Sequence, residues 1–178
     1  MLKTILSFGV AAGLLAGVPL FAIVVLYKGP PPDYGMLIGY LIMLAALSLV
    51  FVAVKRRRDD ELGGAIRFWP AFALGLVISL VAGVVYAAAW EVTLAVSKLD
   101  FGTEWARIMM EQQKVKGVSE AELARVAAKM DEFKAMYAKP PYRFAMTLAE
   151  ILPVGLLVSL VSAGLLRNPR FMPAHKRP

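Results

Sequence analysis

The sequence predicts an all-α integral membrane protein, a four-helix bundle with an extracytoplasmic helical hairpin between the third and fourth spans. Hydrophobic residues make up 59% of the 178 residues and the mean hydropathy is +0.64, whereas a soluble domain of this size is closer to half apolar. Charged residues make up 19%, and residues 55–58 and 98–143 hold most of them. Long uncharged stretches between charged segments are typical of a chain that crosses a bilayer several times.

Four uncharged runs are long enough to span a hydrocarbon core of about 30 Å, which needs about 20 residues of helix. We expect spans at about 4–27, 34–54, 68–97 and 144–166 within a single membrane domain, 1–178. The prolines of the turn at 28–33 cannot continue a helix, so the first two spans form a hairpin. The first span is about twice as long as the apolar region of a signal peptide and no A-x-A site follows it, so an uncleaved span is favoured over a cleaved signal.

The short loops predict the orientation through their Lys and Arg content. The loop 55–67 holds five basic residues and the tail 167–178 holds four, whereas the turn 28–33 holds one. We therefore expect a multi-pass membrane protein with both termini and the basic tail in the cytoplasm. The segment 98–143 then lies outside with nine Lys or Arg, but seven Asp or Glu are interleaved and long segments follow the rule less strictly.

The outer segment predicts two helices, within residues 103–138. Ser119 and Glu122 have the spacing of a capping box, which marks a helix start. Apolar residues then recur every three or four positions until Pro140 and Pro141 end the helix; they are Leu123, Val126, Met130, Phe133 and Tyr137. We expect this stripe to pack on the preceding helix, 103–116, as an αα hairpin. The alternative is that the stripe lies on the membrane surface or docks another protein.

Small residues recur at a spacing of four in every predicted span. Because lipid removes the hydrophobic drive between helices, such residues favour close helix packing. The pattern does not separate packing within one chain from homo-oligomerisation. The helix-packing residues are Gly9, Gly13, Gly17, Gly35, Gly39, Gly75, Ser79, Gly83, Gly155 and Ser159. The similar segments at 75–83 and 155–164 would suggest an inverted repeat and transport, but apolar segments match one another easily.

A candidate intramembrane polar site combines two carboxylates, Glu91 and Glu150, near the outer ends of the third and fourth spans. A carboxylate at this depth is unfavourable by about 2.5 kcal/mol or more and usually has a partner. Arg143 lies seven residues before Glu150, on nearly the same helix face, and can pair with either carboxylate; Tyr86 can supply a hydrogen bond. The functional interpretation is a protonatable or cation-binding site. The structural interpretation is a polar pin that fixes the register of two spans.

The sequence gives little support for a catalytic site, a metal site or nucleic acid binding. There are no cysteines and one histidine, His175, so thiolate catalysis and a cysteine or histidine metal cluster within one chain are excluded. The net charge of +7 is explained by basic residues beside spans rather than by nucleic acid binding. No nucleophile–base pair or phosphate loop is visible, so we expect no enzyme activity and no cofactor.

The order of features resembles a family of bacterial membrane proteins called domain of unknown function 4199. The resemblance rests on five stretches that cover nearly the whole chain: GMLIGYLIML at 35–44, KRRRDDELGGAIRFWPAFALGL at 55–76, AWEV at 89–92, GVSEAEL at 117–123 and AEILPVGLLVSL at 149–160. The resemblance implies a similar length and four spans, a place in the bacterial inner (cytoplasmic) membrane, and no activity, substrate or cofactor.

The leading functional hypothesis is a small structural or interaction and assembly protein, with the lipid bilayer as its surroundings and either a homo-oligomer or another membrane protein as its partner. The alternative is a small transporter or channel component that uses Glu91 and Glu150.

Overall fold

The computed structural model describes residues 1–26 and 34–174, and these residues form helices and no strand. The elements are α1 (Leu2–Leu26), α2 (Gly35–Arg56), the π-helical turn η1 (Arg57–Glu61), α3 (Phe68–Ser97), α4 (Phe101–Val115), α5 (Glu120–Tyr137) and α6 (Pro140–Leu166). The all-helical fold class is therefore confirmed. The predicted turn at 28–33, the last residue of the first predicted span and the end of the tail with His175 lie outside the described residues.

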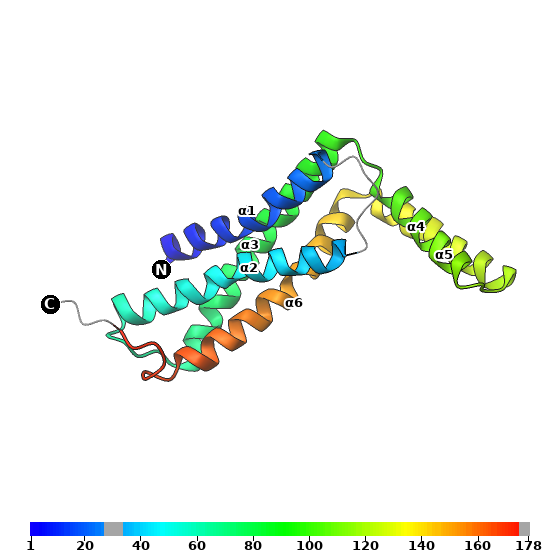
Figure 1. Cartoon of the computed structure of the whole chain (residues 1–178). Coiled ribbons are helices and arrows are strands. Elements are labelled where there is room, and N and C mark those ends of the chain that lie inside the picture. The colour runs from blue at the N-terminus through cyan, green and yellow to red at the C-terminus, as the bar shows by residue number, and fades with distance from the viewer. Residues whose placement is uncertain (27–33, 175–178) are drawn as a thin grey trace.

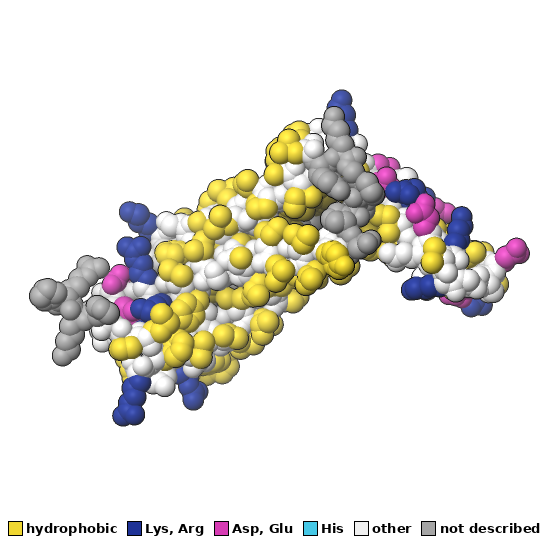
Figure 2. All heavy atoms as spheres, in the orientation of Figure 1, with side chains coloured by type: hydrophobic (Ala, Val, Ile, Leu, Met, Phe, Trp, Pro, Cys, Tyr) yellow, Lys and Arg dark blue, Asp and Glu magenta, His cyan; other side chains and the backbone are white. Residues whose placement is uncertain are grey.

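Four of these helices are long and apolar enough to cross a membrane: α1, α2 with η1, α3 and α6. Their surfaces carry many large exposed apolar side chains, including Leu14, Leu80 and Leu157. Figure 2 shows these side chains as a broad apolar band with Lys and Arg gathered toward its ends. A surface of this kind is unfavourable in water and favourable in lipid, as in a multi-pass membrane protein.

The observed helices differ from the predicted spans mainly at their ends. The predicted span at 68–97 coincides with α3, and α2 continues without a break into η1, so residues 55–61 are helical rather than loop. Helix α6 begins at Pro140, four residues before the predicted start at 144. The two prolines lie in its first turn, where a missing N–H has no helical partner to lose. The same prolines that end α5 therefore begin α6.

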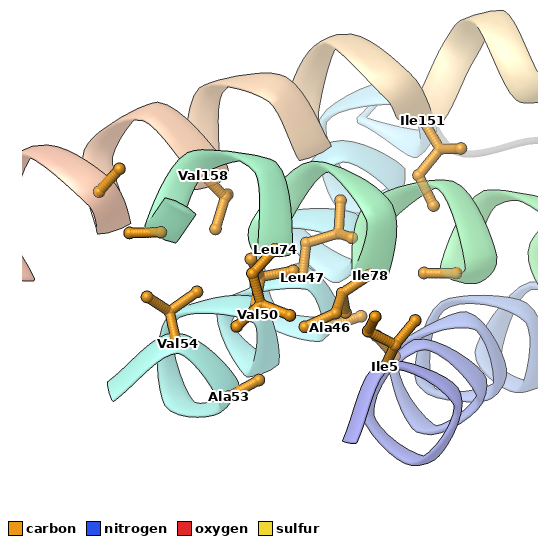
Figure 3. Packing of buried hydrophobic residues seen from close by; sticks show 14 of the residues in the cluster. Ile5, Ala46, Leu47, Val50, Ala53, Val54, Leu74, Ile78, Ile151 and Val158 are labelled. Atoms are coloured by element: carbon orange, nitrogen blue, oxygen red, sulfur yellow. The ribbon is translucent and has the colours of Figure 1, made fainter. Parts of the chain in front are cut away.

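The long helices pack as neighbours in the order α1, α3, α6 and α2, with α2 returning to α1. The start of α1 and the end of α6 lie at one end of the bundle, and α4 and α5 project from the other end, between α3 and α6 (Figure 1). We call α4 and α5 together the arm. The bundle core lies between the four long helices, and Figure 3 shows Leu47 and Val50 of α2 beside Leu74 and Ile78 of α3.

The first small-residue seam brings α1 against α3. Gly9 and Gly13 are buried, and a Cβ atom placed on Gly13 would lie 2.5 Å from Val85 Cβ and 2.7 Å from the carbonyl oxygen of Ala82. Gly17 similarly lies against Ala89. The two helix backbones can approach this closely only because α1 has no side chain on this face.

A second pair of seams crosses reciprocally between α3 and α6. Gly75 faces Ser159, and Gly155 faces Ser79, with Cβ positions 3.0 Å and 2.6 Å from the opposing serine Cβ atoms. The hydroxyls of Ser79 and Ser159 lie 3.4 Å apart, and each also donates to the carbonyl four residues earlier in its own helix. The similar segments at 75–83 and 155–164 thus form a local two-fold helix crossing.

The remaining seam residues do not behave alike. Gly83 lies against Leu148 and Ile151 of α6. Gly35 begins α2 and is half-buried, whereas a Cβ on Gly39 would meet nothing within 4 Å. A packing role for Gly39 within the described chain is therefore not supported. The buried residues of α2 begin only at Met43, so its first half is not packed against the other helices.

Candidate functional site

A bidentate ion pair joins α3 to α6 where the arm leaves the bundle. Arg143 donates from Nε to Oε1 of Glu91 at 3.0 Å and from Nη2 to Oε2 of Glu91 at 2.7 Å. The side chains are 19% and 29% exposed, respectively. This fork geometry is the strongest arrangement of a guanidinium on a carboxylate. The pair keeps both charges compensated at the end of the spans from which the arm projects.

Arg143 also caps the C-terminus of α5. Its Nη1 donates to the carbonyl oxygens of Tyr137 and Ala138, both at 3.3 Å, and such carbonyls have no partner within their own helix. The guanidinium carbon lies 6.0 Å from the centroid of the Tyr137 ring. Because Arg143 stands in the first turn of α6, one side chain ties α3, α5 and α6 together.

An aromatic cluster fills the space beside this ion pair. Trp90 donates from its indole N–H to the hydroxyl of Tyr137 at 2.8 Å. Phe101 lies in the middle, with its ring centroid 5.4 Å from Trp90, 6.0 Å from Trp105 and 5.2 Å from Tyr137. Burial raises the pKa of the Tyr137 hydroxyl, against the opposing effects of the Trp90 hydrogen bond and of Arg143. The base of the arm is thus held by rings from α3, α4 and α5.

An open groove of about 480 Å³ lies beside the junction of the arm and the bundle. Charges of both signs line it, from Glu91 and Arg143 at the bundle to Asp100 and Lys134 on the arm. Asp100 caps α4 by accepting from the backbone N–H of Thr103 at 3.1 Å and from its hydroxyl at 2.7 Å. These hydrogen bonds lower the pKa of the Asp100 carboxyl. With Lys98, the groove presents three cations and two carboxylates, and four of these five side chains already have an ion-pair or hydrogen-bond partner.

The structure separates the two predicted carboxylates. Arg143, which the sequence allowed to pair with either one, pairs with Glu91. Within residues 1–26 and 34–174, Glu150 makes no hydrogen bond and no ion pair. It borders a smaller cavity together with Tyr86, whose side chain is 4% exposed and whose hydroxyl likewise has no hydrogen bond in the described residues.

Two functional features were missed by sequence reasoning. Phe101 precedes the predicted start of the first outer helix at 103, and its role depends on rings that come from three helices. Arg58 is one of the five basic residues of the predicted loop 55–67, yet it is fully buried. It donates to the carbonyl oxygens of Phe171 at 2.9 Å and Met172 at 2.5 Å. A sequence signal for this contact is Phe171, an aromatic residue in the basic tail that packs against the core.

Comparison with known proteins identifies the family and nothing closer. The described residues contain no cluster of His, Cys, Asp or Glu that could hold a metal ion. No curated protein and no solved structure matches the chain. Residues 7–168 match the model of the family described as protein of unknown function DUF4199. This match covers most of the sequence, and the chain therefore belongs to the DUF4199 family.

Proposed function

We propose that this protein is a membrane-anchored interaction and assembly protein whose arm binds another protein chain. The bundle serves as the anchor, and the arm stands on the outer side of the cytoplasmic membrane of a bacterium. The observation that carries the proposal is the incomplete burial of the arm. The buried residues of α4 and α5 are Gly102, Ala106 and Tyr137, all at the base.

The predicted apolar stripe of α5 packs on α4 but is not covered by it. Leu123, Val126 and Met130 remain only half-buried, although α4 and α5 lie side by side. A hollow of about 250 Å³ opens between the two helices and is lined by Ala106, Met110, Ala127 and Met130 among others. Because α4 leaves this stripe only half-buried, an apolar segment of a partner protein can bury more of it by packing into the hollow.

The charge of the arm favours a protein partner over the membrane surface. Residues 101–137 hold six Lys or Arg and six Asp or Glu, so the arm has no net charge. Helices that lie on anionic membranes are typically basic on their polar face. A pattern of alternating signs such as Glu104, Arg107 and Glu111, in which both carboxylates are ion-paired to Arg107, gives no such attraction.

The rigid attachment of the arm to the bundle also supports this proposal. A freely hinged pair of helices would lose entropy on binding, whereas a fixed pair is already ordered. The Arg143–Glu91 pair, the Trp90–Tyr137 hydrogen bond and the rings around Phe101 fix the arm to the bundle.

The orientation rests on the charges at the opposite end of the bundle. Lys55, Arg56, Arg57 and Arg167 lie near the start of α1 and the end of α6, away from the arm, and basic residues favour the cytoplasmic side. The chain has no cysteine, so single cysteines at Lys114 and Asp60 report the topology directly. We expect an impermeant maleimide to label Lys114→Cys from outside and Asp60→Cys only after permeabilisation; the reverse pattern contradicts the orientation.

Photo-crosslinking in native membranes tests the interaction. A photoreactive amino acid at Met130, inside the hollow, is expected to give a discrete adduct, and the same residue at the exposed neighbour Lys129 is expected to give little. A product of twice the mass of the chain identifies a second copy, and another defined mass identifies a different partner protein. Equal adducts at both positions, lipid adducts alone, or none at Met130 contradict the proposal.

A transporter or channel component is the second candidate, and the observation in its favour is that Glu150 has no ion pair within residues 1–26 and 34–174. Glu91 supports it less, because Arg143 already compensates its charge. Liposomes that contain the purified protein test this candidate through proton and cation flux. Flux that exceeds empty vesicles and falls in the Glu150→Gln variant would support transport, whereas flux equal to empty vesicles removes this candidate.

A further inference from the structure

A small cavity of about 180 Å³ lies inside the outer end of the bundle. Leu20 of α1, Tyr86 and Trp90 of α3 and Glu150 of α6 form its sides. Phe101 and Tyr137, at the base of the arm, close it from above. Pockets for drug-sized ligands measure about 300–1,000 Å³, so this cavity fits a smaller group.

The cavity is accessible from the side because α1 and α2 are not packed at this end. No residue of α1 after Gly17 and no residue of α2 before Met43 is buried. Figure 1 shows the two helices diverging toward the arm. A ligand, or the headgroup of a lipid, can therefore reach the cavity without unfolding the bundle.

Glu150 of α6 lies exposed at this cavity, and the described chain provides no cation for its carboxyl group. The nearest candidate cation in the sequence, Arg143, is committed to Glu91 and to two carbonyls of α5. Glu150 itself makes no ion pair or hydrogen bond within residues 1–26 and 34–174. A carboxylate within a membrane span is unfavourable without a partner, so a cation from outside the chain would find an unoccupied counter-charge here.

The walls of the cavity define which cation fits. Trp90 and Phe101 meet at 5.4 Å with perpendicular rings, and Phe101 and Tyr137 lie 5.2 Å apart. The Trp90 N–H is used by the Tyr137 hydroxyl, so these rings offer aromatic surface and few free polar atoms. Aromatic surfaces attract cations, and cages of rings recognise quaternary ammonium groups.

The scarcity of acceptors discriminates between classes of amine. A primary ammonium group has three N–H donors to satisfy. Beyond Glu150, the lining of the cavity offers the hydroxyl of Tyr86 and those of Thr147 and Tyr137, which already take part in hydrogen bonds. A fully methylated ammonium group has no N–H to satisfy. We propose that Glu150, with the rings of Trp90, Phe101 and Tyr137, binds the quaternary ammonium group of a small ligand or of a lipid headgroup.

Binding to the purified full-length protein tests this proposal. In nanodiscs of phosphatidylglycerol, we expect choline and tetramethylammonium to bind saturably by isothermal titration calorimetry, and ethanolamine to bind at least about tenfold more weakly. Glu150→Gln removes the charge with almost no change of shape, and we expect at least about tenfold loss of affinity for choline. The matched control is Glu132→Gln on the exposed surface of the arm, which should bind as the wild type does.

A second variant separates the role of the rings from that of the charge. Phe101→Leu removes one aromatic wall and keeps most of the volume; we expect several-fold weaker binding with unchanged helix content by circular dichroism. Because Glu150 holds no other group in the described chain, Glu150→Gln is expected to fold normally. Competition by phosphatidylcholine added to the nanodiscs identifies a lipid headgroup, and binding without such competition identifies a free ligand; both support the proposal. No saturable binding, equal binding of ethanolamine, or unchanged affinity of Glu150→Gln overturns it.

Discussion

Replacement of Gly13 by alanine tests the packing of α1 on α3. The added Cβ would lie 2.5 Å from Val85 Cβ and 2.7 Å from the carbonyl oxygen of Ala82. Carbon atoms pack best at about 3.5–4.0 Å, so the overlap with Val85 requires a displacement of about 1 Å. The contact with Ala82 is to backbone and cannot be relieved by rotation of a side chain. We therefore expect α1 to move away from α3.

The magnitude follows from two opposing effects. Overpacking of this size costs about 1–3 kcal/mol, while alanine gains about 1 kcal/mol over glycine in helix propensity. Gly39→Ala and Gly164→Ala receive the same propensity gain without the clash, because an added Cβ meets nothing within 4 Å at either position. We expect Gly13→Ala to be less stable than both controls by about 1–3 kcal/mol.

Reversible unfolding in mixed micelles, followed by far-ultraviolet circular dichroism, measures the free energy of unfolding of all three variants. If Gly13→Ala is as stable as Gly39→Ala and Gly164→Ala, the close approach of α1 to α3 through this seam is refuted. A lower stability of Gly13→Ala alone supports the packing argument.

Three further predictions concern charged residues that the fold has placed in fixed contacts. Arg143→Gln is expected to lower the free energy of unfolding by up to about 3 kcal/mol, because it leaves Glu91 without its partner. Asp100→Ala is expected to weaken the start of α4 by about 0.5–2 kcal/mol, measured as faster amide hydrogen exchange there. The Thr103 hydrogen bonds hold the pKa of Asp100 below its ordinary value. The stability that these bonds contribute is therefore present above about pH 4, the unfolded pKa, and is lost as the pH falls through the folded pKa. A ¹³C titration of the Asp100 carboxyl group should give a midpoint below 3.8. Arg58→Leu removes two charged hydrogen bonds to the tail and is expected to cost about 1.5–3 kcal/mol, measured as faster tryptic cleavage after residue 167.

Matched variants accompany these predictions. The double variant Glu91→Gln with Arg143→Gln should recover part of the lost stability, and additive losses would contradict a direct pair. Asp100→Asn should retain the cap and lose the titration. Arg56→Leu removes an exposed cation next to Arg58, and equal cleavage of the two variants would contradict the tail contact.

The sequence by itself determined the helical class and the four long apolar helices. Lipid imposes a minimum length and apolarity on every span. Both properties can be read from a continuous segment such as 68–97, which is why the predicted span coincides with α3. The cap at Ser119 was equally readable, because its hydroxyl accepts from the N–H of Glu122 three residues later, at 3.3 Å.

The tertiary structure decided which polar groups meet. The sequence left Arg143 a choice of two carboxylates, and only the crossing of α3 and α6 brings Glu91 within reach and leaves Glu150 at a cavity. The burial of Arg58 was not predicted, because nothing in the local sequence distinguishes a buried guanidinium from a solvated one. Such contacts join residues 52 to 114 positions apart, and their geometry depends on helix packing rather than on any pattern within one helix.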